Sequence, residues 1–262
     1  MFMKLIDPTL HKDWVTPHST KWYEQIGKLY GEYKYPWNST ITEPNGELIF
    51  NNEVFEIINN KTVLDVGCGH GEFTIKCSEK AKEIVGFDLT NDFIKSGNES
   101  KKLNVSFIVG STKNGLPFET GQFDCAYNRK GPTSAYQELK RVVKKGSKII
   151  GLHPGDDLGI ELPKLFPNLF ESINSEKSIL KTIRQRVELS KFESVEIQVI
   201  NSFEFLHTPL DVLILRCFGQ KQSLIKDIIE NNFLEVKRIF EQNATNEGLP
   251  ITFSRYILRA QV

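Results

Sequence analysis

The segment from Thr62 to Phe73 constrains the fold more than any other part of the chain. It opens with a short apolar run, Val63–Val66, which predicts a buried strand that carries one carboxylate, Asp65. Glycines follow at every second position, and an amphipathic stretch then predicts a helix over 72–82. Because glycine has no side chain, such a strand–loop–helix unit lets the backbone approach a nucleoside closely.

The spacing of these glycines separates two kinds of nucleotide-binding loop. A pyrophosphate-binding turn has the pattern Gly-x-Gly-x-x-Gly, and its third glycine would fall where this chain has Glu72. The observed pattern over residues 67–71 is Gly-x-Gly-x-Gly, preceded by Asp65. A second predicted strand, Ile84–Asp88, ends in a carboxylate that can accept hydrogen bonds from both hydroxyls of a ribose.

This arrangement resembles the first motif of the class I S-adenosylmethionine-dependent methyltransferases, and further segments match that family in the same order. They are the strand ending at Asp88, a third strand at Asn104–Gly110, the segments Gly115–Phe118 and Gly121–Asp124 before a fourth strand, and Leu139–Gly146 before a fifth strand at Lys148–His153. The resemblance covers residues 60–155. It implies an α/β fold, which is Rossmann-like and doubly wound. Its seven-stranded, mostly parallel sheet has helices on both faces and an antiparallel C-terminal strand.

We expect an aromatic, helical lid segment over 1–59 and a methyltransferase domain over 60–262, with a helical insertion at about 157–192. In the C-terminal part, Glu193–Ile200 and Ile251–Leu258 are the predicted edge strands. Helices are predicted there at 209–218 and 222–233.

The resemblance also implies S-adenosylmethionine as the cofactor and S-adenosylhomocysteine as its product. It implies that Asp65 faces the methionine ammonium, that Asp88 holds the ribose, and that Leu89 packs on the adenine. Ser111 and Thr112 stand where many relatives have an acidic residue beside the adenine, and the alternative is that both are loop hydroxyls facing solvent. The other expected cofactor contacts are Gly67, Cys68, Gly69, Gly71 and Asn128.

The residues that would bind the methyl acceptor are less constrained. Arg129 follows the fourth strand and could bind a carboxylate or phosphate of the substrate, or it could be a solvated loop residue. His153 ends the fifth strand and could be a catalytic general base, or a structural histidine. The aromatic N-terminal segment could be a lid over the acceptor, or it could only pack a helix on the sheet. Its candidate substrate-binding residues are Tyr23, Tyr30, Tyr35 and Trp37.

Composition narrows the class of partner. The chain of 262 residues has 33 basic and 33 acidic residues, so no overall charge attracts nucleic acid, although the local cluster at 140–148 still could. Its four cysteines form no Cys-x-x-Cys pair, and no group of residues has metal-ligand spacing. No secretory apolar region and no run of about 20 apolar residues is present. We therefore expect a cytoplasmic protein with reduced thiols, no metal and no membrane partner.

We predict a methyltransferase that transfers the methyl group to a small-molecule acceptor by in-line displacement. One alternative is an RNA methyltransferase acting on rRNA or tRNA. Another is a protein that binds the cofactor without turnover. A nicotinamide-dependent dehydrogenase is disfavoured by Glu72 at the third glycine position.

Overall fold

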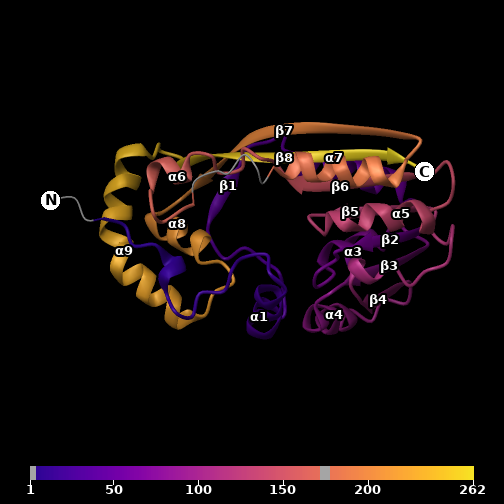
Figure 1. The fold of residues 1–262 in the computed structure, drawn as a ribbon, viewed down its shortest axis with the longest axis horizontal. Coiled ribbons are helices and arrows are strands. Elements are labelled where there is room, and N and C mark those ends of the chain that lie inside the picture. The colour runs from indigo at the N-terminus through magenta and orange to yellow at the C-terminus, as the bar shows by residue number, and fades with distance from the viewer. Residues whose placement is uncertain (1–3, 172–177) are drawn as a thin grey trace. The chain divides into compact units, whose positions relative to one another are not determined.

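The computed structural model describes residues 4–171 and 178–262, and the chain divides into two compact units. Unit 1 comprises residues 1–43, 157–176 and 201–253, and unit 2 comprises residues 44–156, 177–200 and 254–262. Figure 1 labels their helices and strands. The division differs from the expected boundary after residue 59, because helix α2 (Gly46–Ile57) packs in the core of unit 2. The expected insertion is also divided between the two units.

Unit 2 is built on a twisted sheet whose central strands are parallel. The order is β7-β8-β6-β5-β2-β3-β4, in which β6, β5, β2, β3 and β4 pair in parallel and β8 pairs antiparallel with β6. The strand bounds are β2 Thr62–Val66, β3 Glu83–Asp88, β4 Val105–Val109, β5 Cys125–Arg129, β6 Lys148–Pro154, β7 Ser194–Leu206 and β8 Leu249–Gln261. This arrangement confirms the Rossmann-like fold with an antiparallel C-terminal strand.

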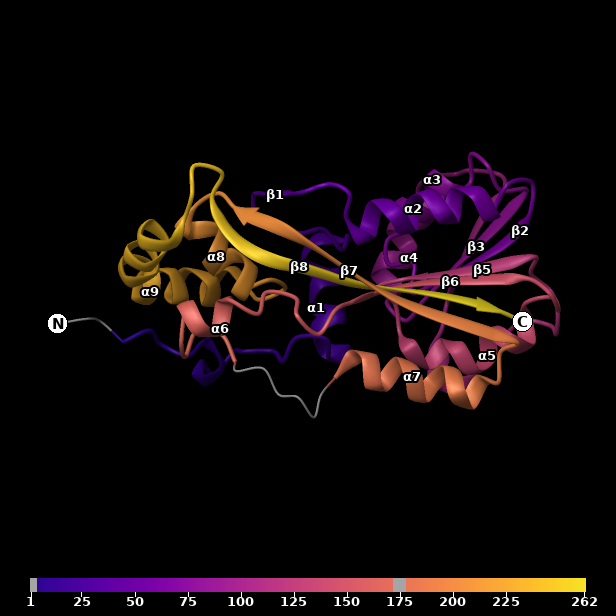
Figure 2. The same cartoon turned by 90° about the horizontal axis from the view of Figure 1, so that it is seen from above.

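Helices cover both faces of this sheet, because neighbouring strand residues point to opposite sides. Leu64 and Ala126 pack in one apolar cluster with α5 and α7, while Val63 and Cys125 pack in another with α2 and α3. Figure 2 shows α5 and α7 on one side of these strands and α2 and α3 on the other. The helices of unit 2 are α2, α3 Glu72–Cys77, α4 Asn91–Asn98, α5 Tyr136–Val142 and α7 Ile179–Ser190.

Strands β7 and β8 are longer than predicted and continue from unit 2 into unit 1. In unit 1, β7 pairs antiparallel with β1 (Ser39–Ile41), which gives the sheet eight strands within the described part of the chain. The register places Ser39 opposite Leu206 and Ile41 opposite Glu204. A strand of three residues is too short to leave a periodic pattern, so the sequence does not predict it.

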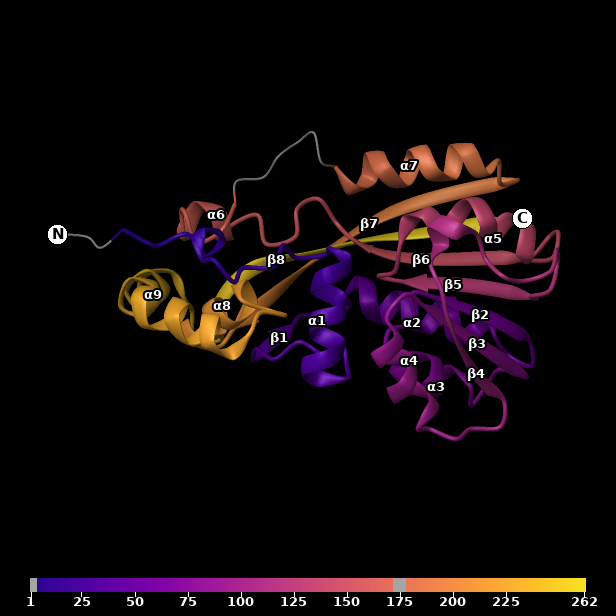
Figure 3. The same ribbon diagram turned by 60° about the horizontal axis from the view of Figure 1, so that its bottom comes forward.

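Unit 1 is mostly helical and has its own apolar core. Its helices are α1 Thr20–Tyr30, α6 Leu162–Leu165, α8 Pro209–Arg216 and α9 Gln222–Asn243. Helices α8 and α9 lie side by side (Figure 3). Helix α9 extends past its predicted end at residue 233 because its buried stripe continues at four-residue spacing to Val236 and Phe240. Among the described helices, none combines the length and apolar character that crossing a bilayer requires.

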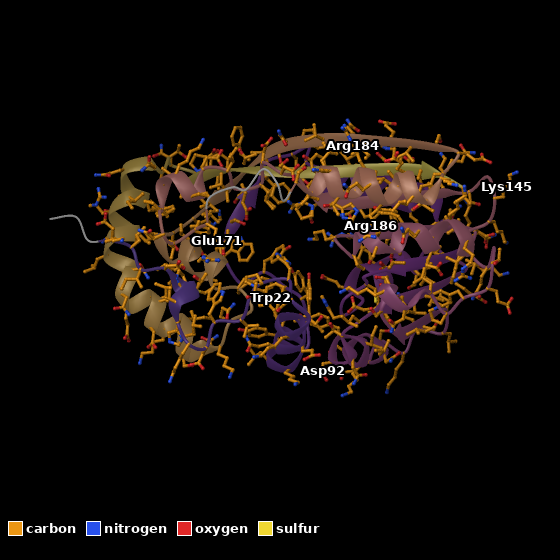
Figure 4. The ribbon with its side chains drawn as sticks, viewed as in Figure 1. Trp22, Asp92, Lys145, Glu171, Arg184 and Arg186 are labelled. Atoms are coloured by element: carbon orange, nitrogen blue, oxygen red, sulfur yellow. The ribbon has the colours of Figure 1, made fainter. Side chains whose placement is uncertain are left out.

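Trp22 anchors α1 within unit 1 and is labelled in Figure 4. Its side chain is buried, its ring meets that of Phe218 edge-on at 5.4 Å, and its indole nitrogen donates to the Phe218 carbonyl at 3.0 Å. Gly219 follows with a φ of +76°, and a Cβ there would lie 2.6 Å from Trp22 Cε2. The indole therefore requires a residue without a side chain at this position.

We expect Gly219→Ala to lower the free energy of unfolding more than Gly146→Ala does. Gly146 has a similar φ of +78°, but a Cβ there meets nothing within 4 Å. Both variants should lose roughly 1–2 kcal/mol from the left-handed backbone, and only Gly219→Ala should lose about 1–3 kcal/mol more from overlap with Trp22. Urea unfolding measures both values, and equal losses would contradict the packing described here.

Candidate functional site

The glycine loop after β2 is held against β3 by its backbone. The amides of Gly67 and Cys68 both donate to the Phe87 carbonyl, at 2.7 and 3.3 Å. Gly67 has a φ of +79°, and a Cβ there would lie 2.5 Å from the Cα of Gly131, in the loop after β5. The loops that follow β2 and β5 therefore touch through backbone atoms, at the strand ends where ligands bind in open α/β sheets.

Asp88, at the end of β3, holds the same glycine loop with its carboxylate. One carboxylate oxygen accepts a hydrogen bond from the Gly69 amide at 2.9 Å, and the other accepts from the Thr90 amide at 2.8 Å. Burial raises the pKa of Asp88 above its usual value. Each carboxylate oxygen can accept a further bond, so the geometry fits the expected contact with two ribose hydroxyls.

Asp65 is the buried carboxylate of β2. Its Oδ2 accepts from the Thr74 hydroxyl at 2.6 Å, whereas Oδ1 has no partner within hydrogen-bonding distance among the described residues. The Tyr127 hydroxyl lies near enough to lower the pKa of Asp65, against the larger effect of burial. Burial raises the pKa of Asp65 to about 7. An unpaired buried oxygen is costly unless a ligand satisfies it. The free Oδ1 beside a loop of glycines fits the ammonium of the expected cofactor, S-adenosylmethionine.

Leu89 and Cys68 flank these two carboxylates. Leu89 follows Asp88 and exposes 45% of its surface, which fits the expected apolar contact with an adenine ring. Cys68 is half-buried in the glycine loop, and burial raises the pKa of its thiol well above the usual value. A neutral thiol can line the loop without adding charge. Both assignments stay predictions.

The remaining polar candidates bond to the protein itself. The Ser111 hydroxyl accepts from the Lys113 amide at 3.3 Å, and the Thr112 hydroxyl lies 2.7 Å from that of Ser134. Asn128 is fully buried, and its carboxamide accepts from the amide of residue 131 at 2.8 Å and donates to the carbonyl of residue 132 at 3.0 Å. Asn128 therefore shapes the loop after β5, and a direct contact of its side chain with the cofactor stays a prediction.

Arg129 lies at the end of β5 in a network centred on Glu47, in the first turn of α2. Its Nη2 donates to Glu47 Oε2 at 2.9 Å, and its guanidinium stacks over the ring of Phe73 at 5.0 Å. Glu47 Oε1 also pairs with Lys130 Nζ at 3.2 Å and with Arg255 Nη2 at 3.0 Å. Burial by itself would raise the pKa of Glu47, but the three cations lower it to about 2. These contacts argue against Arg129 being a solvated loop residue, and its binding to a substrate stays a prediction.

His153, near the end of β6, is buried with 2% of its surface exposed. Its Nε2 lies 2.6 Å from the hydroxyl of Tyr136, and burial lowers the pKa of the imidazole to about 4. A buried, neutral histidine bonded to a buried tyrosine fits the structural alternative better than the general base. Catalysis by His153 stays a prediction.

The aromatic candidates of the N-terminal segment belong to unit 1 and gather around Phe218. Tyr35 and Trp37 stack on each other at 4.6 Å, and both meet Phe218 edge-on. Tyr23 joins this group through the ring of Trp22 at 5.0 Å. The fourth candidate is Tyr30, an exposed residue at the last position of α1. The structure thus brings three of the four together, and their contact with an acceptor stays a prediction.

Several residues around this site were not predicted from the sequence. Glu47 and Arg255 are separated by 208 positions, so no local pattern connects them. Thr74 lies inside an ordinary helical stretch, and nothing in that stretch marks its bond to Asp65. Gly131 had a signal, because a Gly-Pro pair directly after a predicted strand marks a tight turn.

Comparison with known proteins relates this chain to methyltransferases. A family described as "Methyltransferase domain" matches residues 63–146. A tRNA U34 carboxymethyltransferase of Nautilia profundicola is 31% identical over 158 residues, covering 53% of this chain and 50% of that protein. A demethylmenaquinone methyltransferase of Shouchella clausii is 31% identical over 104 residues, covering 35% and 44%. A putative protein N5-glutamine methyltransferase of Methanocaldococcus jannaschii is 30% identical over 171 residues, covering 56% and 83%.

This chain thus spans about half the length of the first two relatives. Among solved structures, a functionally unknown protein from Deinococcus radiodurans aligns with a TM-score of 0.63 at 17% identity. That alignment covers 92% of this chain and 99% of the other. At this identity the likeness concerns the fold, and it extends over both units of the chain.

We expect Asp88→Ala to weaken S-adenosylmethionine and S-adenosylhomocysteine to the same extent, because both carry the ribose that Asp88 would hold. Losing hydrogen bonds to a charged group costs roughly 1.5–3 kcal/mol, or about 10- to 150-fold in affinity. Calorimetric titration measures this loss. Asp92→Ala is the matched control, because Asp92 lies on α4 and pairs with Lys95 at 3.2 Å. A selective loss of one ligand would assign Asp88 another role.

We also expect the burial of His153 to make stability depend on pH. Its folded-state pKa of about 4 lies below the usual 6.5. As pH falls from 6.5 towards 4, this histidine therefore becomes protonated in the unfolded chain but stays neutral in the folded chain. The free energy of unfolding should therefore fall with pH between 6.5 and 4, by up to about 3 kcal/mol from this group. His153→Gln should lose this component in urea unfolding, and Tyr136→Phe should keep it. Equal pH slopes for wild type and His153→Gln would contradict the assignment.

Proposed function

The chain belongs to the class I S-adenosylmethionine-dependent methyltransferases, and we propose that it methylates a small-molecule acceptor. The observation that carries the proposal is the glycine loop held between two carboxylates. Asp88 bonds to the amide of Gly69, and Asp65 keeps one buried oxygen without a partner among the described residues. The proposal that the whole protein is an enzyme is supported by this arrangement and by the relatives named above.

The residues of unit 2 would have separate roles in that reaction. Asp88 would bind the ribose, Asp65 would orient the ammonium, and the glycine backbone would leave room for both. When bound, S-adenosylmethionine supplies a methyl group on a sulfonium, which is a good leaving group. The remaining task of the protein is to hold the acceptor in line with that methyl, and such positioning supplies much of the acceleration.

A small acceptor is favoured over RNA because most of the basic side chains on α5 and in the following turn already make contacts within the protein. Arg141 pairs with Glu138 at 2.6 Å and donates to the Leu116 carbonyl at 2.8 Å. Lys144 pairs with Asp124 at 2.6 Å. Lys140 donates to a backbone carbonyl on the loop after α7, and Lys145 lies in the exposed turn before β6 (Figure 4). Three of the five cationic groups are thus engaged within the protein, and Lys145 and Lys148 remain exposed without such contacts among the described residues, so fewer charges are left for a phosphate backbone.

The names of the relatives supply the alternatives. One is named for tRNA, one for a quinone precursor and one for protein glutamine. Transfer to RNA is the second candidate function, because the tRNA-named relative aligns over 53% of this chain. The third is a protein that binds the cofactor without turnover.

We expect the protein to transfer tritiated methyl groups from S-adenosylmethionine to small molecules of a deproteinised cell extract. No comparable transfer to total RNA or to protein should occur. Asp88→Ala is the inactive control and Asp92→Ala the active one. Label in RNA or protein would replace the small-molecule proposal, and tight cofactor binding without transfer to any fraction would favour a binding protein. His153→Gln should retain turnover if the histidine is structural and lose it if it is the base.

A further inference from the structure

The cluster of Arg129, Lys130, Arg255 and Glu47 carries more positive than negative charge. The carboxylate of Glu47 forms ion pairs with all three cations. Its low pKa keeps Glu47 ionised at neutral pH, so these four side chains, counted by themselves, sum to a formal charge of +2. Charges that are partly buried are screened little by salt, so an arginine in this cluster can attract an anion at its exposed side.

Arg129 still has hydrogen-bonding capacity. Its Nη2 bonds to Glu47 at 2.9 Å and its Nε to Asn51 Oδ1 at 3.4 Å, while its Nη1 makes no hydrogen bond to a described residue. A quarter of the side chain, 26%, is exposed. A guanidinium that is stacked on Phe73 and bonded on one side is held in a fixed orientation, and its second side can bind a carboxylate or phosphate.

Lys130 adds an independent observation. Its φ is +62°, a left-handed conformation that side-chain-bearing residues rarely adopt, and its amide donates to the Leu152 carbonyl at 2.8 Å. Glycine would adopt this conformation without strain, and the chain has a glycine at the next position. Strained residues that persist in folded proteins concentrate at ligand sites. The ammonium group of Lys130 pairs with Glu47 Oε1 at 3.2 Å, so the lysine is held within the cluster.

The cluster lies next to the loop that is expected to bind the methyl donor. Arg129 ends β5, and the loop that follows touches the cofactor loop where Gly67 meets Gly131. Resting on the proposed function, we infer that Arg129 and Lys130 bind an acidic group of the acceptor, either a carboxylate or a phosphate. Glu47 then orients both cations, and Arg255, nearly buried, holds Glu47 in place.

The test measures binding of inorganic phosphate to the full-length protein saturated with S-adenosylhomocysteine, at constant ionic strength. We expect Lys130→Gly to weaken phosphate by roughly tenfold or more. This variant relieves the strained backbone, so the fold is not at risk. Lys101→Gly is the matched control, because Lys101 is an exposed lysine with a φ of +51° outside the cluster. Glu47→Gln should strengthen phosphate binding, because it removes the negative charge of the cluster.

Three results separate the outcomes. Phosphate binding that is equal in wild type, Lys130→Gly and Lys101→Gly, or absent from all of them, would overturn the inference while leaving the methyltransferase proposal intact. Failure of S-adenosylhomocysteine itself to bind would overturn the proposed function instead. A parallel titration with acetate identifies the preferred acidic group, and either preference supports the inference.

The methylated product gives a second measurement. Tritiated product from the extract assay should be retained by an anion-exchange resin at neutral pH, and Lys130→Gly should reduce its formation while Lys101→Gly does not. Label confined to neutral or cationic small molecules would overturn the inference. Label in RNA or protein would overturn the proposed function.

Discussion

The contact between Gly67 and Gly131 is the constraint on which the functional end of unit 2 depends. A side chain on Gly67 would lie 2.5 Å from the Cα of Gly131, and one on Gly131 would lie 2.5 Å from the carbonyl oxygen of Val66. The loops after β2 and β5 can therefore meet only as bare backbone. This contact places the cofactor loop directly beside the residues that follow β5, and both proposed binding functions use that proximity.

Two carboxylates of unit 2, Asp65 and Glu47, have opposite surroundings. Asp65 is buried without a cation in hydrogen-bonding contact, and burial raises its pKa to about 7. Glu47 is also largely buried, but three cations lower its pKa to about 2. Burial disfavours the charge in both cases, and only neighbouring charges reverse the effect. Asp65 is thus suited to bind a cationic group, whereas Glu47 is already paired with three cations.

The parallel strands and the positions of Asp65 and Asp88 on them were predictable from sequence because each leaves a local pattern. Val63–Val66 reads as a buried strand, and Asp65 and Asp88 each lie in or at the end of such a strand. The extension of β7 from residue 200 to Leu206 was not predicted, because the pairing of that end with β1 involves residues far away in the sequence. Strand β1 was missed for a different reason, since three residues give no period.

Glycine spacing and strand periodicity are properties of adjacent residues, so they were enough to predict the methyltransferase fold and its glycine loop. The surroundings of the candidate side chains could be known only from the folded chain. It placed His153 against Tyr136 in a buried position, and it placed Arg129 in ion-pair contact with Glu47, 82 positions away. Burial and charge pairing arise from residues far apart in the chain, and these two effects set the ionisation and accessibility on which any role in binding or catalysis depends.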